Sequence, residues 1–105
     1  MILKLTDSNF EEEVLNSSIP VIIDFYADWC GPCKVMSPII DELAGDHEGK
    51  VKIGKINTDE NEEIVSKYHV MSIPTFLFIK NGQLVDQVVG AVPKTVLEQK
   101  INNML

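Results

Sequence analysis

The segment VIIDFYADWCGPC, Val21 to Cys33, decides the fold of this chain. Its first seven residues, Val21 to Ala27, are almost continuously apolar and rich in the Val, Ile and Phe that favour strands. Such a run is typical of a central strand that is covered on both faces. It carries one charged residue, Asp24, and the only two cysteines of the chain, Cys30 and Cys33, follow just beyond it. Packing alone does not explain a buried carboxylate beside a Cys-x-x-Cys pair.

The other elements follow from hydrophobic spacing on either side of this segment. We expect strands at 2–5, 21–27, 51–57, 75–80 and 83–89, with Asn81-Gly82 as a hairpin turn between the last two. Helices are expected up to about Asn16, from Cys33 onward, near 61–69, and through Leu97, Ile101 and Met104. The first helix has N-cap candidates in Thr6, Asp7 and Ser8. This order predicts one α/β domain over residues 1–105, a mixed sheet with helices on both faces.

Charge and composition exclude several function classes. The formal net charge is −7, with 9 basic against 16 acidic residues, which argues against nucleic acid or an anionic membrane as a partner. No glycine-rich nucleotide-binding motif is present. The N-terminal segment lacks the pattern of a signal peptide, and no stretch approaches transmembrane length. We therefore expect a cytosolic protein, in which a cysteine pair is more often catalytic or metal-binding than structural.

Three non-catalytic interpretations of Cys30 and Cys33 are weak. As a structural disulfide, so short a loop would contribute only about 2 kcal/mol. A zinc site needs two more ligands, and the only histidines, His47 and His69, fall in separate segments that we expect at the surface. A copper chaperone would present its thiolates after the first strand, whereas a full β-α unit precedes them here.

The redox interpretation explains more of the pattern. The strand places Trp29 and Cys30 at the carboxyl edge of the sheet, where binding and active sites form in α/β folds. Cys30 then lies at a helix N-terminus, whose free N–H groups and dipole favour a thiolate. Pro32 suits the first turn of that helix, and Cys33 follows one turn along, facing the interior. We expect an exposed Cys30 to attack a substrate disulfide and a shielded Cys33 to resolve the mixed disulfide.

At DFYADWCGPC the sequence resembles the thioredoxin family, and the match continues in KVMSPIIDELA, VKIGKINTDEN, SIPTFLFIKNGQ and VVGAVPK. The resemblance implies the thioredoxin fold, a central five-stranded sheet in the order 1-3-2-4-5 flanked by four helices. It implies protein-disulfide reduction with Cys30 as nucleophile and Cys33 as resolving cysteine. The redox-active Cys30-Cys33 disulfide would serve without a bound cofactor or metal. Gly31-Pro32 matches the reducing members, and Tyr26 departs from a tryptophan found in many of them.

Asp24 shares a strand face with Ile22 and Tyr26. In a central strand this face would be buried, and burial without a partner would raise the pKa of Asp24. The resemblance implies that Asp24 lies beneath Cys33 and helps to take its proton, through water, in the second step. Lys55 matches a lysine close enough to modulate the pKa of that carboxyl. The alternative is a structural Asp24–Lys55 pair, or an Asp24 satisfied by hydrogen bonds. We favour the catalytic support role because perturbed pKa values gather at functional sites.

The segment MSIPT provides the second functional indication. The resemblance implies a cis Ile73-Pro74 bond packed against the cysteines, which leaves the backbone of Ile73 free to pair with an extended substrate. The alternative is a proline that merely begins a strand. The resemblance also places a small-residue loop beside the motif. The expected apolar patch around Cys30 comprises Trp29, Gly31, Pro32, Ile73, Gly90 and Ala91.

These observations predict a cytosolic, monomeric protein-disulfide reductase that carries electrons to disulfide-bearing target proteins. By resemblance, an NADPH-dependent flavoprotein, thioredoxin reductase, would reduce it again. Two alternatives remain: a non-catalytic binding subunit with the same fold, and a disulfide oxidant or isomerase. Gly31-Pro32 and the absence of a signal-peptide pattern disfavour the oxidant.

Overall fold

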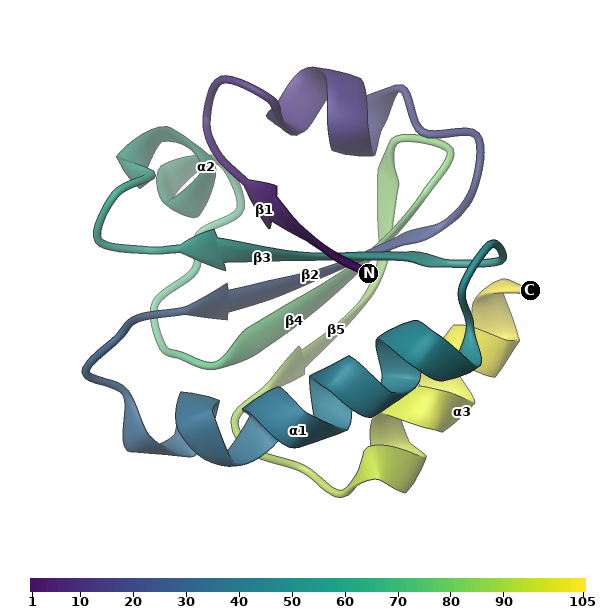
Figure 1. The fold of residues 1–105 in the computed structure, drawn as a ribbon. Coiled ribbons are helices and arrows are strands. Elements are labelled where there is room, and N and C mark those ends of the chain that lie inside the picture. The colour runs from purple at the N-terminus through teal and green to yellow at the C-terminus, as the bar shows by residue number, and fades with distance from the viewer.

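The computed structural model describes residues 1–105, and its elements follow the order that the sequence predicts (Figure 1). The strands are β1 (Ile2–Leu5), β2 (Val21–Tyr26), β3 (Lys52–Asn57), β4 (Thr75–Lys80) and β5 (Gln83–Val89). The helices are η1 (Glu11–Leu15), α1 (Gly31–Asp46), α2 (Glu62–Lys67) and α3 (Lys94–Met104). Predicted and observed bounds agree within two or three residues for most elements, and those of β1, β4 and β5 coincide.

The five strands form one mixed sheet in the order β1-β3-β2-β4-β5, as the resemblance implies. β1, β3 and β2 run parallel, while β4 is antiparallel to β2 and β5 is antiparallel to β4. The β4–β5 turn is the predicted hairpin, because Asn81 (φ 53°) and Gly82 (φ 77°) both adopt the positive φ of such two-residue turns. β2 therefore lies at the centre and its carboxyl end opens onto one edge of the sheet.

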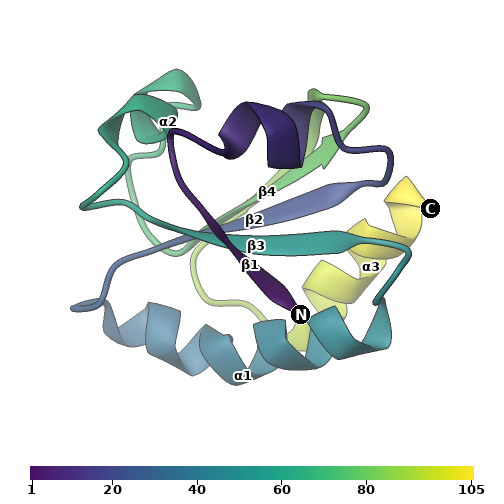
Figure 2. The same cartoon turned by 45° about the horizontal axis from the view of Figure 1, so that its top comes forward.

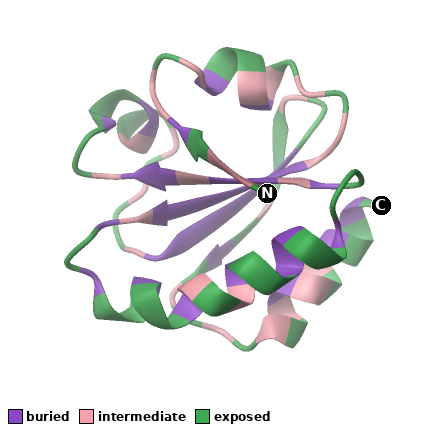
Figure 3. Cartoon of the chain, in the orientation of Figure 1, coloured by how far each residue is buried: buried purple, intermediate pink, exposed green.

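Helices cover both faces of the sheet, with α1 and α3 on one side and η1 and α2 on the other (Figure 2). β2 contributes to both cores by alternation: Ile22 packs with α1 and α3, and Ile23 and Phe25 pack with η1 and α2. The central strands are buried while the outer faces of the helices are exposed (Figure 3). The interpretation of β2 as a strand covered on both faces is confirmed. No helix combines the length and the apolar character needed to cross a membrane.

The N-terminal capping prediction is wrong in one respect. η1 is a single π-type turn whose N-cap, Phe10, has no side-chain capping bond. Asp7 instead caps α2, accepting the N–H of Ile64 at 3.0 Å and that of Glu63 at 3.3 Å. Its own N–H donates to Asn61 Oδ1 at 2.9 Å. The carboxylate serves α2 because the turn after β1 brings it to that helix start, where anions are favoured.

Candidate active site

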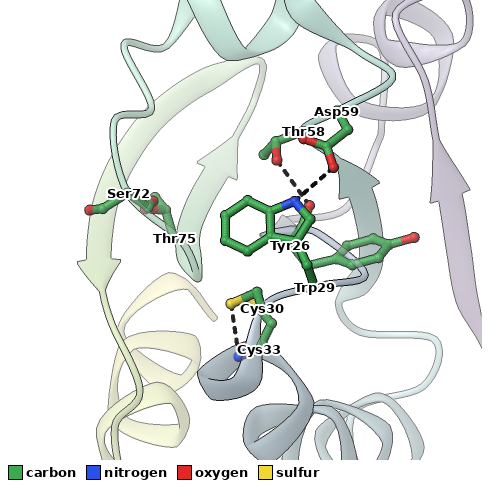
Figure 4. Close-up of a disulfide and its surroundings, with 8 residues drawn as sticks. All are labelled: Tyr26, Trp29, Cys30, Cys33, Thr58, Asp59, Ser72 and Thr75. Atoms are coloured by element: carbon green, nitrogen blue, oxygen red, sulfur yellow. Dashed lines mark hydrogen bonds between the residues drawn. A yellow bond between two sulfur atoms is a disulfide. The ribbon is translucent and has the colours of Figure 1, made fainter.

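The two cysteines occupy the junction between β2 and α1. Cys30 is the N-cap of α1, and its Sγ accepts the backbone N–H of Cys33 at 3.2 Å. Pro32 lies in the first turn, where its missing N–H costs no helical hydrogen bond. Cys30 and Cys33 form a disulfide with a Cα–Cα separation of 5.3 Å (Figure 4). The helix start thus directs a backbone donor at the sulfur that the sequence assigns to nucleophilic attack.

Exposure does not distinguish the two cysteines, contrary to our expectation of an exposed Cys30. Cys30 is 3% exposed and Cys33 6%, because both pack with Ala27 and against the partly buried Tyr26 and Ile73. What separates them is the hollow that each one lines. Cys30 borders a largely apolar groove, and Cys33 borders a smaller pocket that contains charged residues.

The groove beside Cys30, which we call the Trp29 groove, has a volume of about 370 Å³. Its most exposed apolar members are Trp29 (71%) and Met71 (94%). The indole of Trp29 is oriented by a hydrogen bond from Nε1 to Asp59 Oδ2 at 2.9 Å (Figure 4). The lining residues are Trp29, Cys30, Pro32, Thr58, Val65, Val70, Met71, Ser72 and Ile73.

Only part of the predicted patch lines this groove. Trp29, Pro32 and Ile73 do, whereas Gly31, Gly90 and Ala91 do not. The other lining residues and Asp59 are not predicted from the sequence. For Val70, Met71 and Ser72 a local signal existed, because they directly precede Ile73-Pro74. For Thr58, Asp59 and Val65 no such signal existed, because only the tertiary fold brings the segment after β3 and helix α2 beside the loop between β2 and α1, where Asp59 accepts the hydrogen bond of Trp29.

The Ile73-Pro74 bond is cis, as the resemblance implies, and Pro74 is buried. The carbonyl of Pro74 accepts the N–H of Gly90 at 2.8 Å, which ties the end of β5 to this segment. Gly90 has φ 91°, a left-handed conformation that favours glycine. The backbone N–H and C=O of Ile73 take part in no hydrogen bond. An extended chain in the Trp29 groove therefore meets one free backbone donor and one free acceptor.

Asp24 lies in the buried centre of β2, 1% exposed, and its Oδ1 has no hydrogen-bond partner. Burial raises the pKa of Asp24 to about 6, and the positive charge of Lys55 works against that rise. Lys55 is its register partner on β3, yet the two side chains form no ion pair. Lys55 Nζ instead donates to Ser37 Oγ at 3.2 Å and lies 5.3 Å from the centroid of the Tyr26 ring. Asp24 therefore forms neither a direct ion pair with Lys55 nor a full set of hydrogen bonds.

The pocket beside Cys33, which we call the Lys55 pocket, connects these groups. Its lining residues are Tyr26, Ala27, Asp28, Cys33, Lys34, Ser37 and Lys55. Cys33 and Ser37 come from the same face of α1, four residues apart, and Lys55 comes from β3. Ser37 is not among the predicted site residues, because nothing in the local sequence pattern distinguishes it from any other helix-surface serine.

His47 lies at the opposite end of α1 from the cysteines. His47, which we expected at the surface, is only 9% exposed, and its Nε2 lies 2.8 Å from Glu98 Oε2. It follows the last residue of α1, whereas the cysteines lie at the first turn. The prediction is wrong because α3 packs over the end of α1 and covers His47. His69 is exposed, and no three His, Cys, Asp or Glu side chains are grouped as potential metal ligands.

Comparison with known proteins agrees with this geometry. The family model described as Thioredoxin matches residues 1–103. Thioredoxin 1 of Nostoc sp. is 53% identical over 102 residues, which is 97% of this chain and 95% of that protein. The thioredoxin of Haemophilus influenzae is 52% identical over 101 residues, 96% of this chain and 94% of that protein. The thioredoxin of Synechocystis sp. is 50% identical over 102 residues, with coverage of 97% and 95%. The chain therefore belongs to the thioredoxin family, and its Cys30–Cys33 pair is the redox-active centre of a protein-disulfide oxidoreductase.

Proposed function

We propose that Cys30 is the attacking cysteine and Cys33 the resolving cysteine in the reduction of protein disulfides. The observation that carries this assignment is the N–H of Cys33 directed at Cys30 Sγ from the start of α1. A backbone donor and the positive end of a helix both stabilise a thiolate. Cys30 also borders the Trp29 groove, where a target chain can be held, whereas Cys33 faces the Lys55 pocket.

The reaction proceeds in two exchange steps. The Cys30 thiolate attacks one sulfur of the target disulfide, so that a mixed disulfide forms and the other target sulfur leaves as a thiolate. Cys33 then loses its proton and attacks Cys30 Sγ, which closes the Cys30–Cys33 disulfide and releases the second target thiolate. Two electrons pass from the cysteine pair to the target, and the released thiolates take up two protons.

Asp24 is proposed to take the proton of Cys33 in the second step. Its pKa of about 6 leaves it mostly ionised at neutral pH and yet basic enough to accept a proton. The free Oδ1 provides an acceptor with no competing donor. Lys55 lies beside Asp24 in register and lines the same pocket as Cys33, which supports a route through water between the two groups.

Targets are proposed to bind as extended chains in the Trp29 groove. The free N–H and C=O of Ile73 would pair with the target backbone, and Trp29 and Met71 would cover apolar side chains next to the target cysteine. Backbone pairing over an open apolar groove suits many different protein targets. We further propose that the protein works in the cytosol, where thiols are kept reduced, and that an NADPH-dependent flavoprotein reductase restores its dithiol.

The direction of electron flow is tested by a redox titration in buffers of fixed thiol–disulfide potential. The fluorescence of Trp29, the only tryptophan, and alkylation of free thiols report the two states. We expect a two-electron midpoint well below about −200 mV, as a reductant requires. A midpoint near about −180 mV or higher would reassign the protein as an oxidant or isomerase.

The roles of the two cysteines are tested by trapping. Cys33→Ser retains the attacking thiol and cannot resolve, so it should accumulate a mixed disulfide with a protein target through Cys30. Cys30→Ser is the matched control and should trap no target. Mass spectrometry of the cross-linked peptide identifies the bonded cysteine. Trapping by Cys30→Ser rather than Cys33→Ser would reverse the assignment.

A further inference from the structure

The position of Lys55 depends on a contact that the reaction scheme does not use. Lys55 Nζ has one hydrogen-bond acceptor, Ser37 Oγ at 3.2 Å, and takes part in no salt bridge. The face of the Tyr26 ring provides a second, weaker contact at 5.3 Å. Ser37 therefore links α1, which carries Cys33, to the lysine that stands beside Asp24.

We propose that Ser37 is a positioning residue, whose hydroxyl holds the Lys55 ammonium in the pocket that Cys33 also lines, and thereby sets the pH range in which Asp24, the register partner of Lys55, can take the proton. The inference deepens the proposed function and rests on it for its catalytic consequence. Its electrostatic part stands on the geometry of the resting protein, because Asp24 and Lys55 are register partners on adjacent strands. Burial raises the pKa of Asp24, and the charge of Lys55 limits that rise.

Other charges nearby would attract Lys55 if the hydroxyl were removed. Asp28 lines the Lys55 pocket, and Asp41 lines an adjoining hollow that Lys55 and Tyr26 also border. Either carboxylate would draw the ammonium away from the buried Asp24. β4 adds no charge on this side, since Phe76 stands opposite Asp24. On the other side of β3, β1 adds Lys4, which is the register partner of Lys55 and lines the same hollow as Asp41. The titratable or charged groups around Asp24 and Lys55 are thus Lys4, Tyr26, Asp28, Cys33, Lys34 and Asp41.

The expected size of the effect follows from Coulomb's law. Moving a unit charge about 2 Å further from a carboxylate, at separations near 6 Å and an effective dielectric constant near 20, changes a pKa by roughly half a unit. When the Lys55 ammonium lies further from Asp24, it stabilises the carboxylate less. The pKa of Asp24 then rises, and the carboxylate form appears only at higher pH. Resolution of the mixed disulfide would then be about twofold slower near pH 6 and unchanged above about pH 8.

Ser37→Ala tests the proposal in the oxidised protein, where the cysteines do not titrate. The carboxyl carbon signal of Asp24 in an NMR pH titration should move its midpoint upward by roughly half a unit. Ser37→Thr keeps the hydroxyl and should restore the original midpoint. Ser37 is half-buried on the helix surface, and alanine favours helix, so the variant is expected to fold.

A double-mutant cycle with Lys55→Gln separates positioning from other effects. Lys55→Gln should raise the Asp24 midpoint by more than Ser37→Ala does, and adding Ser37→Ala should then change nothing further. An unmoved midpoint in Ser37→Ala, or an equal shift in the Lys55→Gln background, would overturn the positioning role. The proposed function fails separately, if Asp24→Asn resolves mixed disulfides as fast as the original protein.

Discussion

Asp24 and Lys55 stand opposite each other on β2 and β3, yet they form no ion pair, because the lysine reaches to Ser37 Oγ and Asp24 Oδ1 stays without a partner. When Asp24 is ionised, its Oδ1 is removed from water without gaining a hydrogen bond that compensates for the lost hydration. The site therefore retains a group that destabilises the fold when it is charged. A purely structural residue at this position would be apolar or fully hydrogen-bonded.

The first prediction concerns stability against pH. The folded-state pKa of Asp24 is about 6 against 3.8 in the unfolded reference. Ionisation of the buried Asp24 therefore destabilises the folded state relative to the unfolded state. This loss of stability is absent below about pH 3.8, grows as the pH rises, and is complete above about pH 6. Asp24→Asn removes this cost, so the free energy of unfolding of the oxidised variant, relative to that of the original protein, should rise by about 2.5 kcal/mol between pH 4 and pH 7. Urea unfolding at each pH measures the difference.

Asp24→Ser also removes the carboxyl and is the second variant for this prediction, and it should show the same pH-dependent gain in stability. Parallel stability curves for Asp24→Asn and the original protein would show that the carboxyl of Asp24 titrates alike in the folded and unfolded states.

The second prediction separates the two exchange steps. Asp24→Asn should slow the resolution of a preformed mixed disulfide by up to about 100-fold at pH 7, the lower range for general-base catalysis. Attack by Cys30 should change little, because the N–H of Cys33 that favours its thiolate remains in place. Quenched-flow alkylation measures both rates. Slowing of both steps to the same extent would assign Asp24 to the fold of the site rather than to the proton of Cys33.

Local signals account for what the sequence predicted well. The apolar run at Val21–Tyr26 dictates a strand covered on both faces, and Asn81-Gly82 dictates a turn with two positive φ angles. The cis Ile73-Pro74 bond has no such signal, because most X-Pro bonds are trans, and it followed only from the family resemblance.

Contacts between distant segments account for what was missed. Asp7 caps a helix whose N–H groups lie 56 and 57 residues further along the chain. The burial of Cys30 depends on Ile73 packing against it from the other side of the groove. Ser37 acquires its partner only when α1 lies over β3. None of these contacts leaves a periodic pattern in the sequence.

The third prediction concerns the bond between Trp29 and Asp59. Asp59→Ala removes the acceptor of the indole N–H, so the ring should become mobile at the edge of the groove. The fluorescence anisotropy of Trp29 should fall, and kcat/KM for a protein target should fall by roughly threefold to tenfold, equivalent to about 1 kcal/mol. Asp59→Asn keeps a carbonyl acceptor and should behave like the original protein. Equal losses in both variants would point to the charge of Asp59 rather than to its hydrogen bond.

The fourth prediction concerns Met71, which is 94% exposed and lines the Trp29 groove with Cys30. A target chain lying in the groove would bury part of this side chain, and about 40 Å² of apolar contact stabilises a complex by about 1 kcal/mol. Met71→Gln keeps the length but not the apolar surface, so KM for a protein target should rise by about fivefold. A small aromatic disulfide that bypasses the groove should react at the original rate.

Two controls make this result specific to the groove. Met71→Leu keeps an apolar side chain and should retain the original KM. Leu105→Gln changes another exposed apolar residue, 57% exposed, which does not line the groove, and should have no effect. If Met71→Gln slowed the small disulfide as much as the protein target, Met71 would act on the reactivity of Cys30 instead. An unchanged KM for the protein target would mean that bound targets do not reach this side of the groove.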